Sequence, residues 1–296
     1  MSFKSGFIAI VGRPNVGKST LLNRIIGQKI AIVSPKSQTT RNCIRAIYNG
    51  DDCQMVFLDT PGIHKPQNKL GQYMMRSQRQ AQDGCDAIVA MVTADDFFGP
   101  TDAAMLDNLR AADCPCFAVI NKMDAASQEL LAQTEQKLRQ YDFLAGIIGI
   151  SAVTGEGVDA LLDALIGVLP EGEPFFPPDM VCDYPERFLA QEIIRERMLE
   201  LLKDEVPHGV GVNIVQMRQR DNGKLYILAD IFCERKSHKG IIIGKGGAML
   251  RQIGTGAREE LERVLDTGVY LELFVKVQED WRNTENSLKQ LGYTDD

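Results

Sequence analysis

The chain has 296 residues, which is enough for two domains, and its 44% hydrophobic content supports a packed core. It contains no long apolar run and no leader-like start, so we expect neither a membrane-spanning helix nor a secretory signal. The net charge of -7 argues against non-specific nucleic-acid binding by the whole surface, but it permits a local basic patch. The spacing of the seven cysteines fits neither a zinc site nor a disulfide framework and favours reduced thiols in the cytoplasm.

The first part of the chain, residues 1–168, alternates short β-branched runs with helical patterns. The expected strands are Phe7–Val11, Cys43–Tyr48, Met55–Leu58, Ala87–Val92, Phe117–Ile120 and Ile147–Ile150. The expected helices include Thr20–Ile26, Gln128–Tyr141 and Val158–Val168. This alternation predicts an α/β domain with a doubly wound, mostly parallel sheet and helices on both faces. Ligands of such sheets bind at the carboxyl ends of the strands, where the motifs described next fall.

A phosphate-binding loop pattern, G-x-x-x-x-G-K-[ST], follows the first expected strand and runs from Gly12 to Ser19. Its two glycines let the backbone curl so that N–H groups point at phosphate oxygens, and the next helix adds partial positive charge. The alternative is a tight strand–helix turn without a ligand. We expect the following residues to bind phosphates: Gly12, Arg13, Pro14, Asn15, Val16, Gly17, Lys18, Ser19, Thr20 and, from the next motif, Gly62.

Two further motifs suit the outer phosphate and a magnesium ion. The segment Asp59 to Gly62 follows a strand, where the aspartate can hold magnesium through a water and the Gly62 N–H can meet the terminal phosphate. The polar loop Gln38 to Arg41 precedes another strand, and a threonine there can close over magnesium only when the terminal phosphate is present. Each motif alone is often only a turn, but their order along the chain predicts a nucleotide site.

An N-K-x-D motif from Asn121 to Asp124 predicts the choice of base. The Asp124 carboxylate can accept two hydrogen bonds from the Watson–Crick edge of guanine, whereas adenine lacks the exocyclic amine at that position. A backbone N–H of Ser151-Ala152, after the last strand, can meet the guanine carbonyl oxygen. We therefore expect GTP rather than ATP, with guanine bound by Asn121, Lys122, Asp124, Ser151 and Ala152.

Together these motifs resemble those of TRAFAC-class GTPases. The loop sequence GRPNVGKST and the paired threonines Thr39-Thr40 resemble the TrmE-Era-EngA branch of that class. The resemblance implies that Thr40, rather than Thr39, binds magnesium together with Ser19 and Asp59. The two nucleotide-sensitive segments are then switch I, made of Gln38, Thr39, Thr40, Arg41 and Asn42, and switch II, made of Asp59, Thr60, Pro61, Gly62 and Ile63.

One position departs from small Ras-like GTPases. Those proteins have a glutamine after the switch II glycine that orients the attacking water, and this chain has Ile63 there. Asn15 matches the asparagine with which some relatives hold a potassium ion, and such an ion could replace an arginine finger. The alternative is that Asn15 only braces the loop. The neighbouring His64 reads as a surface histidine rather than a catalytic base.

The chain changes character at residues 169–184, a proline-rich stretch that we interpret as a semi-rigid linker. Beyond it, residues 185–296 predict a helix at Glu186–Lys203, strands at Val210–Gln219 and Lys224–Cys233, a glycine-rich loop, a helix through Arg263 and a strand at Val269–Val277. The Asp221-Asn-Gly223 turn signal predicts that the first two strands form a hairpin.

The loop Gly244–Gly247 has the form GxxG between two helical segments, as in KH domains of the bacterial type (type II). Such a loop can press against the sugar–phosphate backbone of about four nucleotides because it has little side-chain bulk. Six basic and no acidic residues lie between Arg235 and Arg258. We expect RNA to contact Arg235, Lys236, Lys239, Ile242, Ile243, Gly244, Lys245, Gly246, Gly247 and Arg251, with the two isoleucines supporting splayed bases.

A GTPase domain, a proline-rich linker and a KH domain in this order resemble the Era family of bacterial ribosome-assembly GTPases. The resemblance extends over nearly the whole chain, including the segments 188–197, 241–247 and 270–277 and the ending Leu291-Gly-Tyr293. It implies GTP hydrolysis with Mg²⁺, binding near the 3′ end of 16S rRNA, maturation of the small (30S) subunit, and partial peripheral attachment to the inner face of the cell membrane.

Other functions stay open at this point. The chain could be an RNA-binding scaffold whose GTP site is structural and has little catalysis, which the isoleucine at position 63 would suit. It could also be a GTPase of tRNA modification, although no separate chemical domain or cofactor motif is visible. We expect a cytoplasmic monomer.

Overall fold

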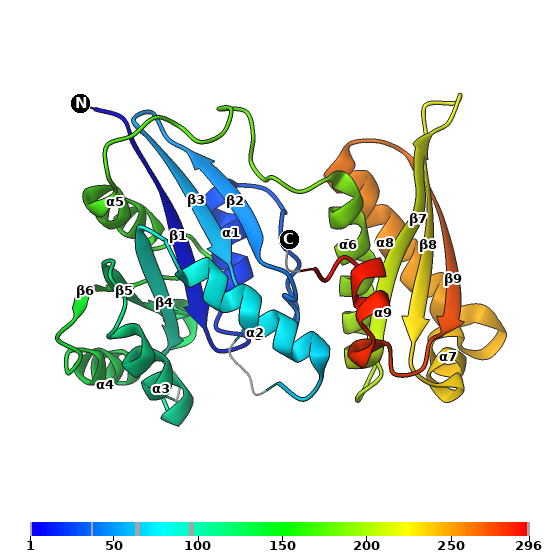
Figure 1. Ribbon diagram of the computed structural model, residues 1–296, viewed down its shortest axis with the longest axis horizontal. Coiled ribbons are helices and arrows are strands. Elements are labelled where there is room, and N and C mark those ends of the chain that lie inside the picture. The colour runs from blue at the N-terminus through cyan, green and yellow to red at the C-terminus, as the bar shows by residue number, and fades with distance from the viewer. Residues whose placement is uncertain (1, 37, 63–65, 95–97, 295–296) are drawn as a thin grey trace. The chain divides into compact units, whose positions relative to one another are not determined.

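The structure is a computed structural model that describes residues 2–36, 38–62, 66–94 and 98–294 (Figure 1). The chain divides into two compact units. The first unit contains Met1–Ala31, Thr40–Lys65 and Met74–Asp183, and the second contains Ile32–Thr39, Pro66–Tyr73 and Tyr184–Asp296. The predicted boundaries differ in two respects. They assign the short segments 32–39 and 66–73 to the first domain, and they set residues 169–184 apart as a linker, whereas the first unit extends to Asp183 and the second begins at Tyr184.

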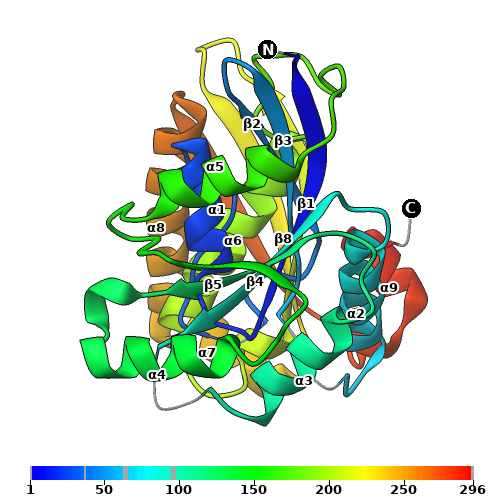
Figure 2. The same cartoon turned by 90° about the vertical axis from the view of Figure 1, so that its left-hand side faces the viewer.

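A six-stranded sheet forms the centre of the first unit (Figure 1, Figure 2). Its strands are β1 (Lys4–Gly12), β2 (Ile44–Asn49), β3 (Cys53–Asp59), β4 (Ala87–Thr93), β5 (Cys116–Asn121) and β6 (Leu144–Gly149), in the order β2-β3-β1-β4-β5-β6. Only β2 runs antiparallel to its neighbour, which confirms the predicted mostly parallel sheet. β1 lies between β3 and β4: strands β2 and β3 are on one side of it, and strands β4, β5 and β6 are on the other. The loop after β1 therefore lies at the topological switch point, where ligands of such sheets bind.

Helices cover both faces of this sheet. They are α1 (Lys18–Ile26), α2 (Lys69–Gln82), α3 (Pro100–Leu109), α4 (Gln128–Leu138) and α5 (Val158–Val168). Figure 2 shows α1 and α5 on one face and α2 and α3 on the other. Strands β3, β4 and β5 are buried along their whole length, as expected for parallel strands covered on both sides. The predicted strand Ile147–Ile150 is displaced by a few residues from the observed β6.

The proline-rich segment that begins at residue 169 packs against the first unit through specific contacts. The ring of Phe175 lies 4.8 Å from that of Phe7. The amide of Gln54 donates to the carbonyl of Phe176 at 2.8 Å and accepts from the N–H groups of Phe175, at 2.7 Å, and Phe176, at 2.9 Å. Cys182 forms an isolated bridge with Ala46 in β2. The extended backbone that proline favours is therefore anchored to the sheet edge almost to its end.

The second unit has a three-stranded sheet with helices on one face (Figure 1). Its elements are α6 (Glu186–Leu201), β7 (Val210–Gln219), β8 (Leu225–Cys233), α7 (Lys236–Ile243), α8 (Ala248–Leu265), β9 (Val269–Val277) and α9 (Glu285–Gln290). Strands β7 and β8 are antiparallel, while β8 and β9 are parallel. Apolar side chains of α6, α8 and the strands form its core. Across the described residues, no helix is long and apolar enough to cross a membrane.

Candidate functional site

The loop after β1 wraps around the start of α1 and encloses Lys18. The side chain of Lys18 is buried, and its ammonium group donates to the main-chain carbonyls of Gly12 and Arg13, both at 3.1 Å. Burial lowers the pKa of Lys18 from its usual value to about 8, and the nearby carboxylate of Asp59 opposes that shift. A buried cation at the mouth of a helix N-terminus is suited to binding phosphate.

At two positions, Gly17 and Gly62, atoms from the ends of other strands or from another loop lie so close that only glycine fits. Gly17 has φ of 102°, and a Cβ there would lie 2.2 Å from the side-chain nitrogen of Asn121. A Cβ on Gly62, after β3, would lie 2.9 Å from the backbone nitrogen of Pro14. The structure therefore brings the predicted phosphate loop, switch II and base-binding motif together at the carboxyl ends of the strands.

Three oxygen-bearing side chains gather beside this loop. The Ser19 hydroxyl donates to Asp59 Oδ2 at 2.7 Å, and Thr40 Oγ1 lies 3.0 Å from Ser19 Oγ and 3.4 Å from Asp59 Oδ2. Asp59 is 0% exposed, and its Oδ1 atom has no hydrogen-bond partner among the described residues. Burial raises the pKa of Asp59, whereas Lys18 and the two hydroxyls act in the opposite direction. Such a set of oxygens with one buried, unpaired carboxylate oxygen fits a bound Mg²⁺.

The predicted switch residues are divided between the units. Gln38 and Thr39 belong to the second unit, whereas Thr40, Arg41 and Asn42 belong to the first. Thr39 turns away from the oxygen cluster, because its hydroxyl donates to the carbonyl of Lys36 at 2.6 Å. In switch II, the buried Thr60 hydroxyl bonds the carbonyl of Ile10 at 2.8 Å, and Pro61 follows it. Ile63 and His64 lie outside the described residues.

Asn121 links the phosphate loop to the base-binding loops. Its amide donates to the carbonyl of Val16 at 2.7 Å and accepts from the N–H of Ala152 at 2.9 Å. The Ser151 N–H donates to the carbonyl of Glu156 at 2.9 Å. Both N–H groups of this pair, from which we expected one to meet guanine, therefore bond other protein groups in this structure and brace the loop. The contact with guanine stays a prediction.

Lys122 and Asp124 lie at the surface, next to the hydrogen bonds that Asn121 forms. Both are exposed, and Lys122 has φ of 66°, in the left-handed region. The N–H of Met123 donates to the carbonyl of Ile150 at 3.1 Å, which fixes the turn between the two residues. The arrangement leaves the Asp124 carboxylate accessible to the edge of a bound base.

Two further predicted residues of the phosphate loop, Arg13 and Asn15, differ in their surroundings, while Thr20 lies half-buried in the first turn of α1. Arg13 Nε donates to the fully buried Asp102 at 2.7 Å, so this guanidinium is paired with α3. Sequence reasoning missed Asp102, although its place three residues after Gly99, at the start of a helix, was a capping signal. Asn15 is exposed and has φ of 65°, a conformation that asparagine tolerates better than most residues.

In the second unit, the GxxG loop joins α7 to α8. Gly244, Gly246 and Gly247 all have positive φ, at 72°, 61° and 78°. A Cβ on Gly244 would lie 2.8 Å from Cβ of Met249, so the turn has no room for a side chain. Lys245 at its tip is exposed. The loop thus presents a bare backbone and the exposed ammonium group of Lys245.

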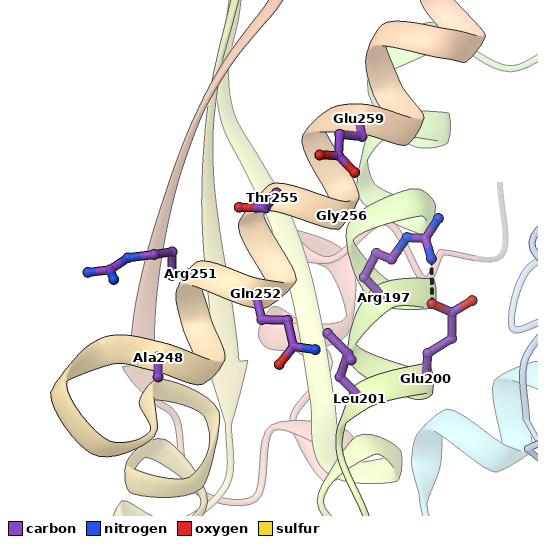
Figure 3. A pocket seen from close by; sticks show the side chains of 9 residues that line it. All are labelled: Arg197, Glu200, Leu201, Ala248, Arg251, Gln252, Thr255, Gly256 and Glu259. Atoms are coloured by element: carbon purple, nitrogen blue, oxygen red, sulfur yellow. Dashed lines mark hydrogen bonds and ion pairs between the residues drawn. The ribbon is translucent and has the colours of Figure 1, made fainter.

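Two hollows adjoin this loop on either side of α8. The first, of about 370 Å³, is lined by Gly247, Leu250, Arg251, Gly254, Thr255, Leu271 and Leu273. The second, of about 550 Å³, lies between α6 and α8 and is lined by Arg197, Glu200, Leu201, Ala248, Arg251, Gln252, Thr255, Gly256 and Glu259 (Figure 3). Arg251 and Thr255 line both. Figure 3 shows Arg197 paired with Glu200, whereas Arg251 extends away from α6.

One predicted RNA contact is wrong. Ile242 is 0% exposed because it belongs to the core of the second unit, so it cannot support a base. Ile243 is partly buried against the same core, and the exposed isoleucine is Ile241, at 49%. The basic residues around α7 are accessible: Arg235 and Lys236 are exposed and Lys239 is half-buried.

Two family models match the chain. The 50S ribosome-binding GTPase family matches residues 7–122, and the KH domain family matches residues 205–282. Among curated relatives, GTPase Era of Clostridium botulinum (strain Alaska E43 / Type E3) is 50% identical over 292 residues, covering 98% of this chain and 99% of that protein. GTPase Era of Alkaliphilus metalliredigens (strain QYMF) is 49% identical over 294 residues, covering 99% and 100%.

Two solved structures are similar over the whole chain. An Era variant of Aquifex aeolicus bound to GDP·AlF4⁻ has a TM-score of 0.94 at 40% identity, covering 99% of this chain and 100% of that one. Era in complex with MgGDPNP and nucleotides 1506–1542 of 16S ribosomal RNA has a TM-score of 0.94 at 40% identity, covering 99% of each chain. With its nucleotide loops and GxxG loop placed as described above, this chain belongs to the Era family of GTPases.

Proposed function

We propose that this GTPase binds Mg²⁺ and GTP at the loop after β1, hydrolyses GTP to GDP and phosphate, and binds the 3′ region of 16S rRNA through its KH domain during biogenesis of the 30S subunit. The observation that supports the nucleotide site best is the cluster of Ser19, Thr40 and Asp59 beside Lys18, with one buried carboxylate oxygen left unpaired. The rRNA assignment is supported by the complex of the relative described above.

Each residue of the nucleotide site then has a specific role. The N–H groups from Asn15 to Ser19 surround the phosphates, and Lys18 neutralises the charge on the outer ones. Ser19 and Thr40 donate oxygens to the ion directly, and Asp59 acts through a water. When bound, Mg²⁺ neutralises the charge that develops between the β- and γ-phosphates. The exposed Asp124 accepts the two N–H groups of guanine, while Asn121 braces the loops from behind.

The rival function is a GTP-binding scaffold with little catalysis. Single-turnover hydrolysis by the whole protein, with and without rRNA, separates the two. We expect slow intrinsic turnover, well below the roughly 5–20 per second of an activated Ras-type complex, because the chain has Ile63 where a water-orienting glutamine would stand. Phosphate release that is abolished by Asp59→Ala supports the enzyme. Phosphate release that is unchanged in this variant would contradict the site.

We infer a potassium ion as a second cation, held by Asn15. The motivation is the exposed position of this asparagine in the phosphate loop, combined with the missing glutamine. Exchange of sodium for potassium should accelerate turnover, and Asn15→Ala should abolish the difference. Asn15→Gly is the matched control for the backbone, because glycine also adopts positive φ. Equal rates in the two salts would leave Asn15 with a role only in the loop's conformation.

We also propose that the protein is a monomer with partial peripheral attachment to the cytoplasmic face of the membrane. The membrane attachment rests on the family resemblance alone. Light scattering of the purified protein checks the first. Flotation with vesicles of anionic phospholipid, compared with neutral vesicles, checks the second, and absence from both lipid fractions would remove membrane attachment from the proposal.

A further inference from the structure

A buried charged residue of α6 binds the backbone of switch I. Arg195 is 0% exposed, although it is an arginine in the middle of a helix. Its guanidinium donates to the main-chain carbonyls of Gln38, at 3.4 Å, and of Thr39, and it forms an ion pair with Glu192. All of these residues belong to the second unit, which contains the segment Ile32–Thr39.

The same segment is fixed by α6 at its beginning. Glu196 is 3% exposed, and its Oε1 atom accepts from the N–H of Val33 at 2.9 Å. The ammonium group of Lys36 donates to the carbonyl of Leu202, which follows the last residue of α6. Two adjacent residues of α6 and the residue that follows the helix therefore hold the start, the end and the middle of the segment 32–39.

Burial of these charges requires an explanation. Removing an arginine from water is costly unless every donor finds a partner, and Glu192 alone does not supply enough acceptors. The remaining acceptors are carbonyls of a loop that is about 150 residues distant in sequence. Gln38 itself has φ of 59°, an unfavourable conformation for this residue, and the bond from Arg195 to its carbonyl stabilises it.

Thr40, the expected magnesium ligand, directly follows the two residues whose carbonyls Arg195 binds. The chain passes from the second unit to the first between Thr39 and Thr40. The Thr39 carbonyl and the N–Cα bond of Thr40 lie in one planar peptide group. A hydrogen bond to that carbonyl therefore also orients the backbone of Thr40. Thr40 Oγ1 then lies 3.0 Å from Ser19 Oγ.

We propose that Arg195 is a positioning residue for the GTP site: by binding the carbonyls of Gln38 and Thr39, it places Thr40 on the magnesium ion of the GTP-bound form. The proposal rests on the proposed function, in which Thr40 meets magnesium only when the terminal phosphate is present. A KH-domain helix thereby contributes to the discrimination between GTP and GDP. GDP binding does not need Thr40 and should not depend on Arg195.

The experiment measures the affinities of the full-length protein for a non-hydrolysable GTP analogue and for GDP, across a range of Mg²⁺ concentrations. Arg195→Met should reduce analogue affinity by about tenfold or more, because charge-assisted hydrogen bonds to the loop are lost, and leave GDP affinity within about twofold. The Mg²⁺ concentration needed for half-maximal analogue binding should rise in parallel. Arg195→Lys, which keeps a cation but loses the fork, should fall between the two.

Two further variants separate the effect of Arg195 on switch I from a general loss of stability. Arg195→Met leaves the Glu192 carboxylate buried without its ion pair. The double variant Glu192→Leu/Arg195→Met removes both charges, so it tests the loss of the hydrogen bonds to Gln38 and Thr39 without that penalty. Arg197→Met is the matched control, because Arg197 lies on the same helix and bonds Glu200 at 2.6 Å rather than switch I. Hydrogen exchange at the amides of residues 38–42 gives a second readout that is independent of activity.

The expected result is a loss of analogue affinity in Arg195→Met and in the double variant, with faster exchange at residues 38–42 in the analogue complex. Arg197→Met should behave like wild type. An unchanged ratio of analogue affinity to GDP affinity in the double variant would overturn the proposal, whether both affinities stay as in wild type or fall by the same factor. A wild-type protein whose analogue binding is independent of Mg²⁺ would instead contradict the proposed magnesium site itself.

Discussion

The side chain of Asn121 donates to the carbonyl of Val16 at 2.7 Å, so the guanine-binding loop and the phosphate loop form one hydrogen-bonded structure. Because the same amide also accepts from Ala152, it fixes three loops at once. We predict that Asn121→Ala weakens GTP and GDP binding alike, by about tenfold, since each neutral hydrogen bond contributes about 0.5–1.5 kcal/mol. Calorimetric titration with both nucleotides checks this, and a loss confined to GTP would contradict it.

Base selection should depend on Asp124 instead. Asp124→Asn presents a donor to the donors of guanine, and the loss should reach several kcal/mol, because hydrogen bonds to charged groups contribute about 1.5–3 kcal/mol each. Xanthosine triphosphate, which has a carbonyl in place of the amine, should become the better ligand. Binding of GTP by the variant within a few-fold of wild type, together with rejection of the xanthine nucleotide, would show that another residue selects the base.

The burial of Lys18 predicts a pH dependence. Burial lowers its pKa to about 8 in the folded, nucleotide-free protein, and bound phosphates require the charged form. Affinity for GTP should therefore be constant below pH 8 and fall by up to tenfold per pH unit above it. Guanosine lacks phosphates and is the control, because titration of the guanine ring affects both ligands and cancels in their ratio. A ratio that stays constant up to pH 9 would contradict the lowered pKa.

The same shift has the opposite sign for stability. An unfolded lysine titrates near 10.5, so between about pH 8 and 10.5 the unfolded chain binds more protons than the folded one. Below pH 8 both states carry the proton, and the cost of burying the charge is fully present. The contribution of Lys18 to the free energy of unfolding therefore increases as the pH rises from 8. Urea unfolding of wild type and Lys18→Met at several pH values isolates this contribution, and equal pH dependence would refute it.

RNA binding should depend on the GxxG loop. Exchange of Lys245 and Gly246 for aspartate should reduce rRNA affinity through charge reversal and through bulk against the sugar–phosphate backbone. Three to five phosphate contacts predict a slope of log affinity against log salt of about -2 to -3.5, and the variant should have a shallower slope. The double variant Lys289→Asp/Gln290→Asp, an equal charge change in α9, is the control. Equal weakening by both variants would indicate a general charge effect rather than a site.

Local patterns predicted most of the elements. Strands β7 and β9 begin and end where alternation of apolar and polar residues stops, at Val210–Gln219 and Val269–Val277. The strand before the phosphate loop and the helix Val158–Val168 were equally clear. The GTPase and KH folds were therefore predicted correctly from periodicity and motifs.

The failures share a physical cause, which is dependence on contacts distant in sequence. Three consecutive isoleucines, Ile241 to Ile243, have no periodicity that shows which one faces the core. Arg195 and Glu192 resemble an ordinary exposed i, i+3 ion pair of a helix, and only the fold buries them against switch I. The engagement of the Ala152 N–H by Asn121 likewise depends on two loops meeting.

We predict that the nucleotide state controls the affinity for RNA. Because the second unit contains the switch I residues up to Thr39, we expect a terminal phosphate that fixes Thr40 to act on the unit that contains the GxxG loop. The decisive measurement is the affinity of the full-length protein for an RNA of the 16S 3′ end, in the presence of a GTP analogue and of GDP, together with the reverse titration. We predict that rRNA affinity differs between the two forms, and that rRNA changes nucleotide preference by the same factor, as linkage requires. Equal rRNA affinity in both forms, with no effect of rRNA on nucleotide preference, would show that the two activities are only tethered and would contradict this account.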